Sequence, residues 1–143
     1  MAEHQSTSDP AEQAMWPLVV WAARCSIYLL AQGALLLLAY AYYGFDTDPE
    51  SFALGFRIDP ILATVNLAWG VAGTFFGFFR PRYALPFVLA LAAFYTALAV
   101  LGSFTAVDLG MMLNGRVNRF NWLVAIAAWG VGLYTLWRKP RTH

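Results

Sequence analysis

The distribution of hydrophobic and polar positions divides this chain into four apolar stretches separated by short polar segments. Each stretch contains no Asp, Glu, Lys or Arg, and together they cover residues 25–43, 60–79, 85–104 and 121–137. A helix needs about 17–25 mostly apolar residues to cross the hydrocarbon core of a membrane. In lipid a single span satisfies its backbone hydrogen bonds internally only as a helix. The short alternating segments of a β-barrel are absent from the sequence.

The pattern therefore predicts an all-α, polytopic membrane protein built as a four-transmembrane-helix bundle. The expected transmembrane domain covers residues 16–137, with helices at about 18–45, 58–79, 84–106 and 120–137. Residues 1–23 contain three acids and no Lys or Arg, which is a poor start for a secretory signal, so we expect the first helix to be retained.

The segments outside these helices carry helix-start signals and basic residues. Asp9-Pro10-Ala11-Glu12 combines an N-cap, a first-turn proline and a glutamate, so residues 1–15 are expected to form a cytoplasmic tail with a short capped helix. Pro17 is expected to interrupt the chain before the first span. A second start signal, Asp48-Pro49-Glu50, predicts an interfacial helix over residues 49–54. Residues 138–143 are expected to form a basic cytoplasmic tail.

A short motif occurs twice in the chain. "NLAWGVAG" (66–73) precedes the basic "RPR" (80–82), and "IAAWGVGL" (126–133) precedes the basic "RKPR" (138–141). The spacing favours two repeated helical hairpins of about 60 residues, although Ala, Trp, Gly and Val can also recur by chance. Small residues allow helix backbones to approach closely in lipid. The predicted helix-packing residues are Gly70, Gly73, Gly77, Ala128, Gly130 and Gly132.

The charged residues indicate an orientation. The chain is 60% hydrophobic and only 12% charged, with nine basic against eight acidic residues, so nothing in it favours nucleic-acid binding. Six basic residues would lie on one side of the membrane and three on the other. The six are Arg24, Arg80, Arg82, Arg138, Lys139 and Arg141, and the three are Arg57, Arg116 and Arg119. The positive-inside rule then places both termini in the cytoplasm. We expect the chain to cross the inner (plasma) membrane of the cell.

Reactive groups are scarce in the apolar stretches. The two histidines, His4 and His143, lie in the terminal tails, and the one lysine is Lys139. A haem b or a histidine-ligated chlorophyll inside the bundle would need an intramembrane His, and a retinal Schiff base would need a Lys there. The single Cys25 cannot form an intramolecular disulfide. We therefore expect no enzyme activity, no catalytic residue, no metal site and no cofactor.

Two groups of polar residues remain as candidates. Gln32, Asn66, Thr96 and Asn121 are polar positions inside the predicted spans. They would either join helices by hydrogen bonds or form a polar patch for a lipid headgroup, quinone or pigment. Arg57, Asp59, Arg116 and Arg119 are expected at the outer rim, where they would form either an ordinary solvated rim or a docking surface for a partner.

Residues 51–137 resemble a family of uncharacterised bacterial four-helix integral membrane proteins, a domain of unknown function. The resembling segments are "LGFRIDPILATVNLAWGVAG" and "NRFNWLVAIAAWGVG", with Asn121-Trp122-Leu123, Gly70 and Gly73 matching the family's motifs. Histidines that are usual in that family are replaced here by Leu62, Asn66 and Val124. The resemblance implies a four-helix fold and a membrane location, and it implies no activity.

Two function classes follow from the sequence. The first is a non-catalytic integral membrane subunit that packs against other transmembrane helices of a larger complex, of the respiratory or photosynthetic type. The alternative is a small-molecule, lipid or pigment/quinone-binding membrane protein, or an oligomeric channel or carrier. The expected partners are membrane lipid and either other integral membrane subunits or further copies of this chain.

Overall fold

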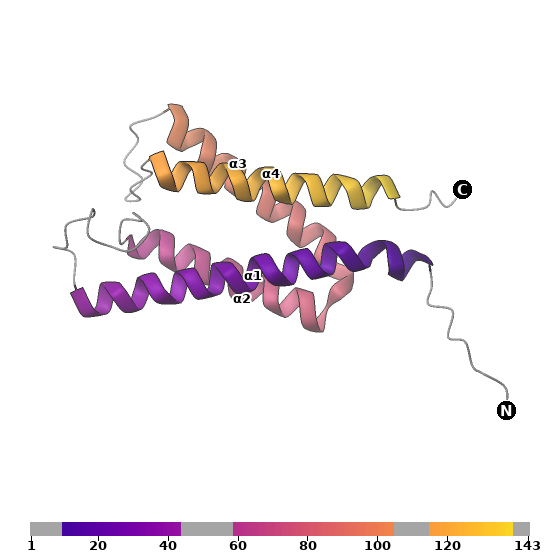
Figure 1. Ribbon diagram of the computed structural model, residues 1–143, viewed down its shortest axis with the longest axis horizontal. Helices are drawn as coiled ribbons and strands as arrows, with labels where there is room; N and C mark the ends of the chain where they lie inside the picture. The colour runs from indigo at the N-terminus through magenta and orange to yellow at the C-terminus, as the bar shows by residue number, and fades with distance from the viewer. Residues whose placement is uncertain (1–9, 44–58, 105–114, 139–143) are drawn as a thin grey trace.

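The protein is an all-helical, four-helix structure, as the hydrophobic pattern predicts (Figure 1). The structure is a computed structural model that describes residues 10–43, 59–104 and 115–138, with side chains from residue 15 onward. The helices are α1 (Pro10–Tyr43), α2 (Pro60–Phe79), α3 (Ala84–Phe104) and α4 (Gly115–Arg138), and the short 3-10 helix η2 (Pro81–Tyr83) joins α2 to α3. All four are long and apolar enough to cross a membrane, so the predicted multi-pass fold class is confirmed.

Helix α1 differs from the expectation at its N-terminal end. The structure has one continuous helix of 34 residues with Pro17 inside it, so the predicted short separate helix and the break at Pro17 are wrong. Proline removes one backbone donor and crowds the preceding turn, which disfavours a helix interior. Leu18 and Ala22 directly after Pro17 are buried at 0% and 1% exposure in the main hydrophobic core. Packing of this segment explains why the helix continues through the proline.

The other helix boundaries differ by a few residues. Helix α2 begins at Pro60, because the Asp59 carboxylate accepts hydrogen bonds from the backbone N–H groups of Ile61 and Leu62 and caps the helix. Helix α4 begins at Gly115, five residues before its expected start. The predicted interfacial helix at 49–54 and the predicted helix ends at 45 and 106 lie outside the described residues.

The four helices form two hairpins. The most extensive helix–helix contacts are those of α1 with α2 and of α3 with α4. The three-residue η2 segment connects the two pairs, and the start of α1 lies at the same end of the bundle as the end of α4 (Figure 1). The expected arrangement of helical hairpins is therefore present.

Glycines bring α1 and α2 into backbone contact. A Cβ atom on Gly33 of α1 would lie 2.6 Å from both the Ala63 carbonyl oxygen and the Leu67 nitrogen. A Cβ atom on Gly70 of α2 would lie 2.6 Å from the Leu30 Cα. Since no other residue could fit at such distances, Gly33 and Gly70 define the crossing of the two helices. Gly33 was not among the predicted packing residues.

The other two predicted glycines of α2 also face α1. A Cβ atom on Gly73 would overlap the Ser26 Oγ and would lie 2.5 Å from the Phe87 ring of α3. Gly77 is less tightly enclosed, since its Cβ atom would lie 3.5 Å from the Ala23 Cβ, an ordinary van der Waals distance. The approach of α1 and α2 is thus closest around Gly70 and relaxes towards Gly77.

Of the three small residues predicted to pack on α4, Ala128 and Gly132 face the other helices of this chain and Gly130 does not. Ala128 is fully buried, and a Cβ atom on Gly132 would lie 2.9 Å from the Leu89 Cδ2 of α3. Gly130 is exposed and a Cβ atom there would meet nothing within 4 Å, so it takes no part in packing among the described helices, and its role in helix packing stays a prediction. Two residues along a helix turn the side chain by about 200°, which places Gly130 on the opposite face from Ala128 and Gly132.

The enclosure of Gly70 leads to a first prediction. Gly70→Ala should lower the free energy of unfolding by about 1–3 kcal/mol, because the new methyl group must push Leu30 and its backbone away. Gly77→Ala is the matched control on the same helix, and it should leave stability equal or raise it by up to about 1 kcal/mol through helix propensity. Denaturant unfolding in detergent micelles, followed by circular dichroism, measures both. Equal effects of the two substitutions would contradict the close crossing at Gly70.

Candidate functional site

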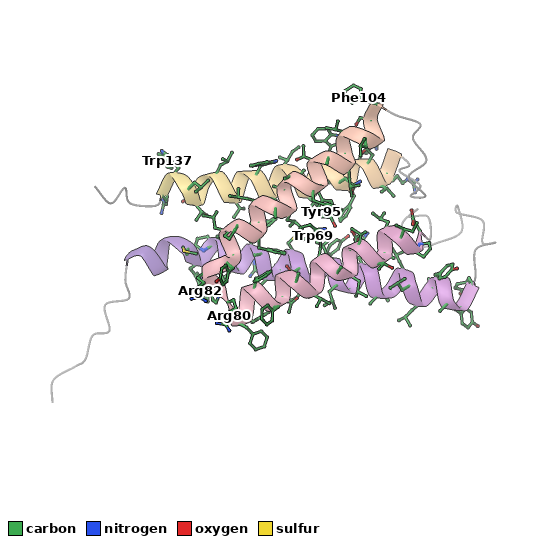
Figure 2. All side chains as sticks on the ribbon, turned by 180° about the vertical axis from the view of Figure 1, so that it is seen from behind. Trp69, Arg80, Arg82, Tyr95, Phe104 and Trp137 are labelled. Atoms are coloured by element: carbon green, nitrogen blue, oxygen red, sulfur yellow. The ribbon has the colours of Figure 1, made fainter. Side chains whose placement is uncertain are left out.

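A chain of hydrogen bonds between polar side chains joins three helices inside the bundle. The Tyr95 hydroxyl of α3 donates to the Asn66 Oδ1 of α2 over 2.6 Å. The Asn66 Nδ2 in turn donates to the Gln32 Oε1 of α1 over 3.4 Å. Tyr95 and Asn66 are both fully buried, and Tyr95 lies on the side of α3 that faces the α1–α2 pair (Figure 2). The interior chain, Tyr95–Asn66–Gln32, therefore ties the second hairpin to the first.

The glycine crossing explains why two of these amides meet. Gln32 directly precedes Gly33, and Asn66 directly precedes Leu67, which the Gly33 backbone approaches. The close approach of the two backbones brings the neighbouring amide side chains within hydrogen-bonding distance. In a membrane such an interhelical bond contributes about 0.6 kcal/mol on average.

Tyr95 was not among the predicted site residues. Tyrosines are enriched at the membrane interfaces, where the ring is apolar and the hydroxyl is hydrated. Tyr95 lies in the middle of an apolar helix, about ten residues from either end of α3. A tyrosine at that position needs a hydrogen-bond partner inside the protein. The position of Tyr95 in mid-span, away from the membrane interfaces, is the sequence feature that could have identified it as an interior hydrogen-bonding residue.

Thr96 does not join the interior chain, although it follows Tyr95 directly. Its hydroxyl donates to the Ala92 carbonyl oxygen over 2.7 Å and accepts a hydrogen bond of 3.0 Å from the Trp129 indole N–H of α4. One residue rotates the side chain by about 100°, so Tyr95 faces α2 while Thr96 faces α4. Thr96 thus joins α3 to α4 and takes no part in the contact between the hairpins.

Asn121 of α4 is fully buried, and neither its Nδ2 nor its Oδ1 has a hydrogen-bond partner among the described residues. The Gln32 Nε2 at the end of the interior chain is also buried and lacks a partner in this part of the chain. A buried polar group without a hydrogen bond costs roughly 1–3 kcal/mol. The Ser26 Oγ and the Asn118 Oδ1 are likewise buried without a partner among the described residues. Of these groups, the amides of Gln32 and Asn121 offer buried N–H donors that are free to bind something else.

A second polar cluster, which the sequence did not reveal, joins the C-terminal end of α3 to the N-terminal end of α4. The Ser103 Oγ of α3 accepts hydrogen bonds from the Asn118 Nδ2 over 2.9 Å and from the Trp122 Nε1 over 3.2 Å. Its own hydroxyl donates to the Ala99 carbonyl oxygen. Through its indole N–H, Trp122 therefore helps to hold the α3–α4 hairpin together.

The residues predicted to lie at the outer rim differ in their exposure. Asp59 is only 5% exposed and serves as the N-cap of α2, so its expected place on an accessible docking surface is wrong. A carboxylate at a helix N-terminus satisfies free backbone donors and interacts favourably with the helix dipole, which explains its burial. Arg116 and Arg119 are exposed near the start of α4, and a docking role for them stays a prediction. Arg57 lies outside the described residues.

The chemistry of the interior chain and Asn121 is limited to neutral hydrogen bonding. The side chains involved are amides and one phenol, which offer donors and acceptors without a formal charge. Within residues 10–43, 59–104 and 115–138, no three His, Cys, Asp or Glu side chains cluster so that they could hold a metal ion. The arrangement can thus bind and orient an uncharged polar group.

Comparisons with known proteins identify no relative of this chain. No family model matches the chain, and no match is found among the curated proteins or among the solved structures. The resemblance to the bacterial four-helix family therefore stays a prediction.

The Tyr95–Asn66 bond leads to a second prediction. Tyr95→Phe keeps the ring contacts but leaves the Asn66 Oδ1 without its donor, so we expect a loss of about 1 kcal/mol in the free energy of unfolding. Tyr134→Phe, at an exposed tyrosine of α4, is the control and should change stability by less than about 0.5 kcal/mol. Denaturant unfolding in micelles compares them, and an unchanged Tyr95→Phe variant would argue against a bond that holds the hairpins together.

Proposed function

We propose that this protein is a non-catalytic integral membrane subunit that packs the outward face of α4 against a transmembrane helix of a larger membrane complex. The observation that carries this proposal is the exposed position of Gly130 in the middle of a membrane-spanning helix. The absence of His from the four apolar stretches, and of any charged residue within them, supports a structural rather than a catalytic role.

The outward face of α4 has the pattern of a helix-packing surface. The exposed residues of this face recur at heptad spacing and are Leu123, Ile126, Ala127, Gly130, Leu133, Tyr134 and Trp137. Ala127 and Gly130 are the smallest residues of this face and lie near its centre, with larger side chains on both sides along the helix, and we refer to this pair as the notch. Such a notch admits the side chains of a second helix, as ridges-into-grooves packing requires.

Lipid contact alone explains large apolar side chains on this face but gives no reason for the small ones. Within the most apolar window of each span, only 28–44% of the residues are buried inside the chain, so most of the helix surface faces outward. Lipid tails provide no hydrophobic drive for helices to associate, and close packing is what stabilises a helix pair in the membrane. A glycine on the outside of a span favours such a pair.

The basic residues support a cytoplasmic location for both termini. Arg80 and Arg82 are exposed at the α2–α3 junction, and Figure 2 shows them towards the same end of the bundle as Trp137, the neighbour of the exposed Arg138. Retention of positive charge in the cytoplasm would orient this end inward, in the inner membrane of a bacterial cell.

Cysteine labelling tests the orientation. In a Cys25→Ala background, Ala2→Cys and His143→Cys should react with a membrane-impermeant maleimide only after the cells are permeabilised. Ser51→Cys, in the segment between α1 and α2, should react in intact cells. Labelling of positions 2 and 143 from opposite sides would contradict four spans, and labelling of both in intact cells would contradict the proposed orientation.

The packing face is tested by filling the notch. Gly130→Leu should leave the fold intact, since a side chain there meets nothing in the chain and glycine is a poor helix former. It should nevertheless reduce co-purification of the larger complex in mild detergent by at least about tenfold, which corresponds to about 1.4 kcal/mol of interaction energy. The control is Ala93→Leu, on the exposed face of α3, which should have no effect. Purification of the wild type as a free monomer, unaffected by Gly130→Leu, would refute the proposal.

A further inference from the structure

The unpaired amides of Gln32 and Asn121 lie on α1 and α4, two helices that contact each other inside the bundle. Gln32 lies three residues beyond Leu29 on α1, and Asn121 lies four residues before Ala125 on α4. Leu29 and Ala125 belong to the same buried hydrophobic cluster as Tyr95. Gln32 lies about one helical turn beyond Leu29, towards the C-terminal end of α1, and Asn121 lies about one turn before Ala125, towards the N-terminal end of α4. The Phe120 ring, next to Asn121, contacts the rings of Tyr28 on α1 and Tyr95 on α3, with centroids 6.0 and 6.3 Å apart.

We call the four interior polar side chains Gln32, Asn66, Tyr95 and Asn121, one from each helix, the polar layer. The hydrogen bonds within it have a direction, since Tyr95 donates to Asn66 and Asn66 donates to Gln32. The series therefore ends on the Gln32 Nε2, a buried donor without an acceptor. Asn121 adds a second unpaired donor, its Nδ2, and one unpaired acceptor, its Oδ1.

We propose that the polar layer binds the carbonyl group of an uncharged amphiphile, whose carbonyl oxygen accepts hydrogen bonds from the Gln32 Nε2 and the Asn121 Nδ2. Two amide donors on neighbouring helices match a carbonyl oxygen, which has two lone pairs. The four side chains of the layer are neutral, so a charged group would lose its hydration without gaining a counter-charge.

The surroundings of the layer fit an apolar body attached to that carbonyl. The Tyr95 ring contacts the rings of Phe94 and Phe120, and the Phe94 ring contacts that of Trp69, with a centroid distance of 5.2 Å. Binding pockets for uncharged ligands combine such aromatic walls with a few placed polar groups. The carbonyl could belong to a glycerolipid ester or to a quinone ring, and the two sources share this recognition chemistry.

Ligand-induced stabilisation of the purified chain tests the proposal. The chain is held in dodecyl maltoside, which contains no carbonyl group, and unfolding is followed with dioleoylglycerol or with a decyl-substituted benzoquinone added. At a concentration about one hundred times its Kd, a bound probe should raise the unfolding midpoint by about 9 °C. A shift with the diglyceride assigns the carbonyl to a lipid, and a shift with the benzoquinone assigns it to a quinone. The ether-linked dioleyl glycerol, which lacks the carbonyl groups, should produce no shift.

Variants separate this layer from the rest of the interior. Asn121→Leu removes an unpaired amide, so without a probe its midpoint should equal or exceed that of the wild type, and the probe-induced shift should be lost. Gln32→Met should weaken probe binding at least about tenfold. Thr96→Val is the control, because Thr96 is bonded to Trp129 and lies outside the layer, and it should keep the full shift. Gly130→Leu should also keep it, which separates this proposal from the packing role of α4.

Three results would overturn the proposal. The first is that neither carbonyl probe shifts the midpoint of the wild-type chain, which would leave water as the partner of the two amides. The second is an equal shift with the ether-linked control, which would show that the carbonyl is not recognised. The third is a shift that survives in Asn121→Leu.

Discussion

The contact between the α1 and α2 backbones at Gly33 and Gly70 is the constraint on which the interior arrangement depends. Neither position leaves room for a Cβ atom, so the helices cross closer than side chains would allow. At that separation Gln32 and Asn66, which lie beside the crossing, come within hydrogen-bonding distance. Asn66 then accepts the hydroxyl of Tyr95, which anchors α3 and with it the second hairpin. A wider crossing would separate Gln32 from Asn66 and leave the Asn66 Nδ2 and the Gln32 Oε1 without partners inside the bundle, which costs free energy where no water is present.

The two copies of the Ala-Trp-Gly-Val motif show how one pattern can serve two purposes. In α2 the glycine of the motif faces α1 and permits the close crossing, whereas in α4 the glycine faces away from the chain. Both tryptophans face α3 even so, since Trp69 contacts Phe94 and Trp129 donates to Thr96. The hairpins therefore share an aromatic contact with α3 but differ in where a small residue admits a neighbouring backbone. Helix α4 consequently carries Asn121 towards the interior and Gly130 towards the outside of the bundle, on different faces of the same helix.

The interior also shows what an uncharged membrane bundle can and cannot do. Amides and a phenol hydrogen-bond, orient and select neutral groups, but they supply no charge to stabilise a transition state. Asp59, the carboxylate expected at the outer rim, is used to cap α2. The two proposals are consistent with these properties, because one concerns shape at the surface of α4 and the other concerns neutral hydrogen bonding between the helices.

The sequence by itself determined the number of helices, their approximate positions and the neutral character of the spans. These properties are local, because the length of a span and its internal hydrogen bonds depend only on its own residues. Only the tertiary structure decided which residues face inward, as Gly130, Thr96 and Asp59 illustrate, and that α1 continues through Pro17. The physical reason is that a span in lipid is apolar on all sides, so the pattern of hydrophobic residues does not mark the buried face. That face is chosen by close packing and by hydrogen bonds to residues on other helices, which sequence spacing within one helix does not contain.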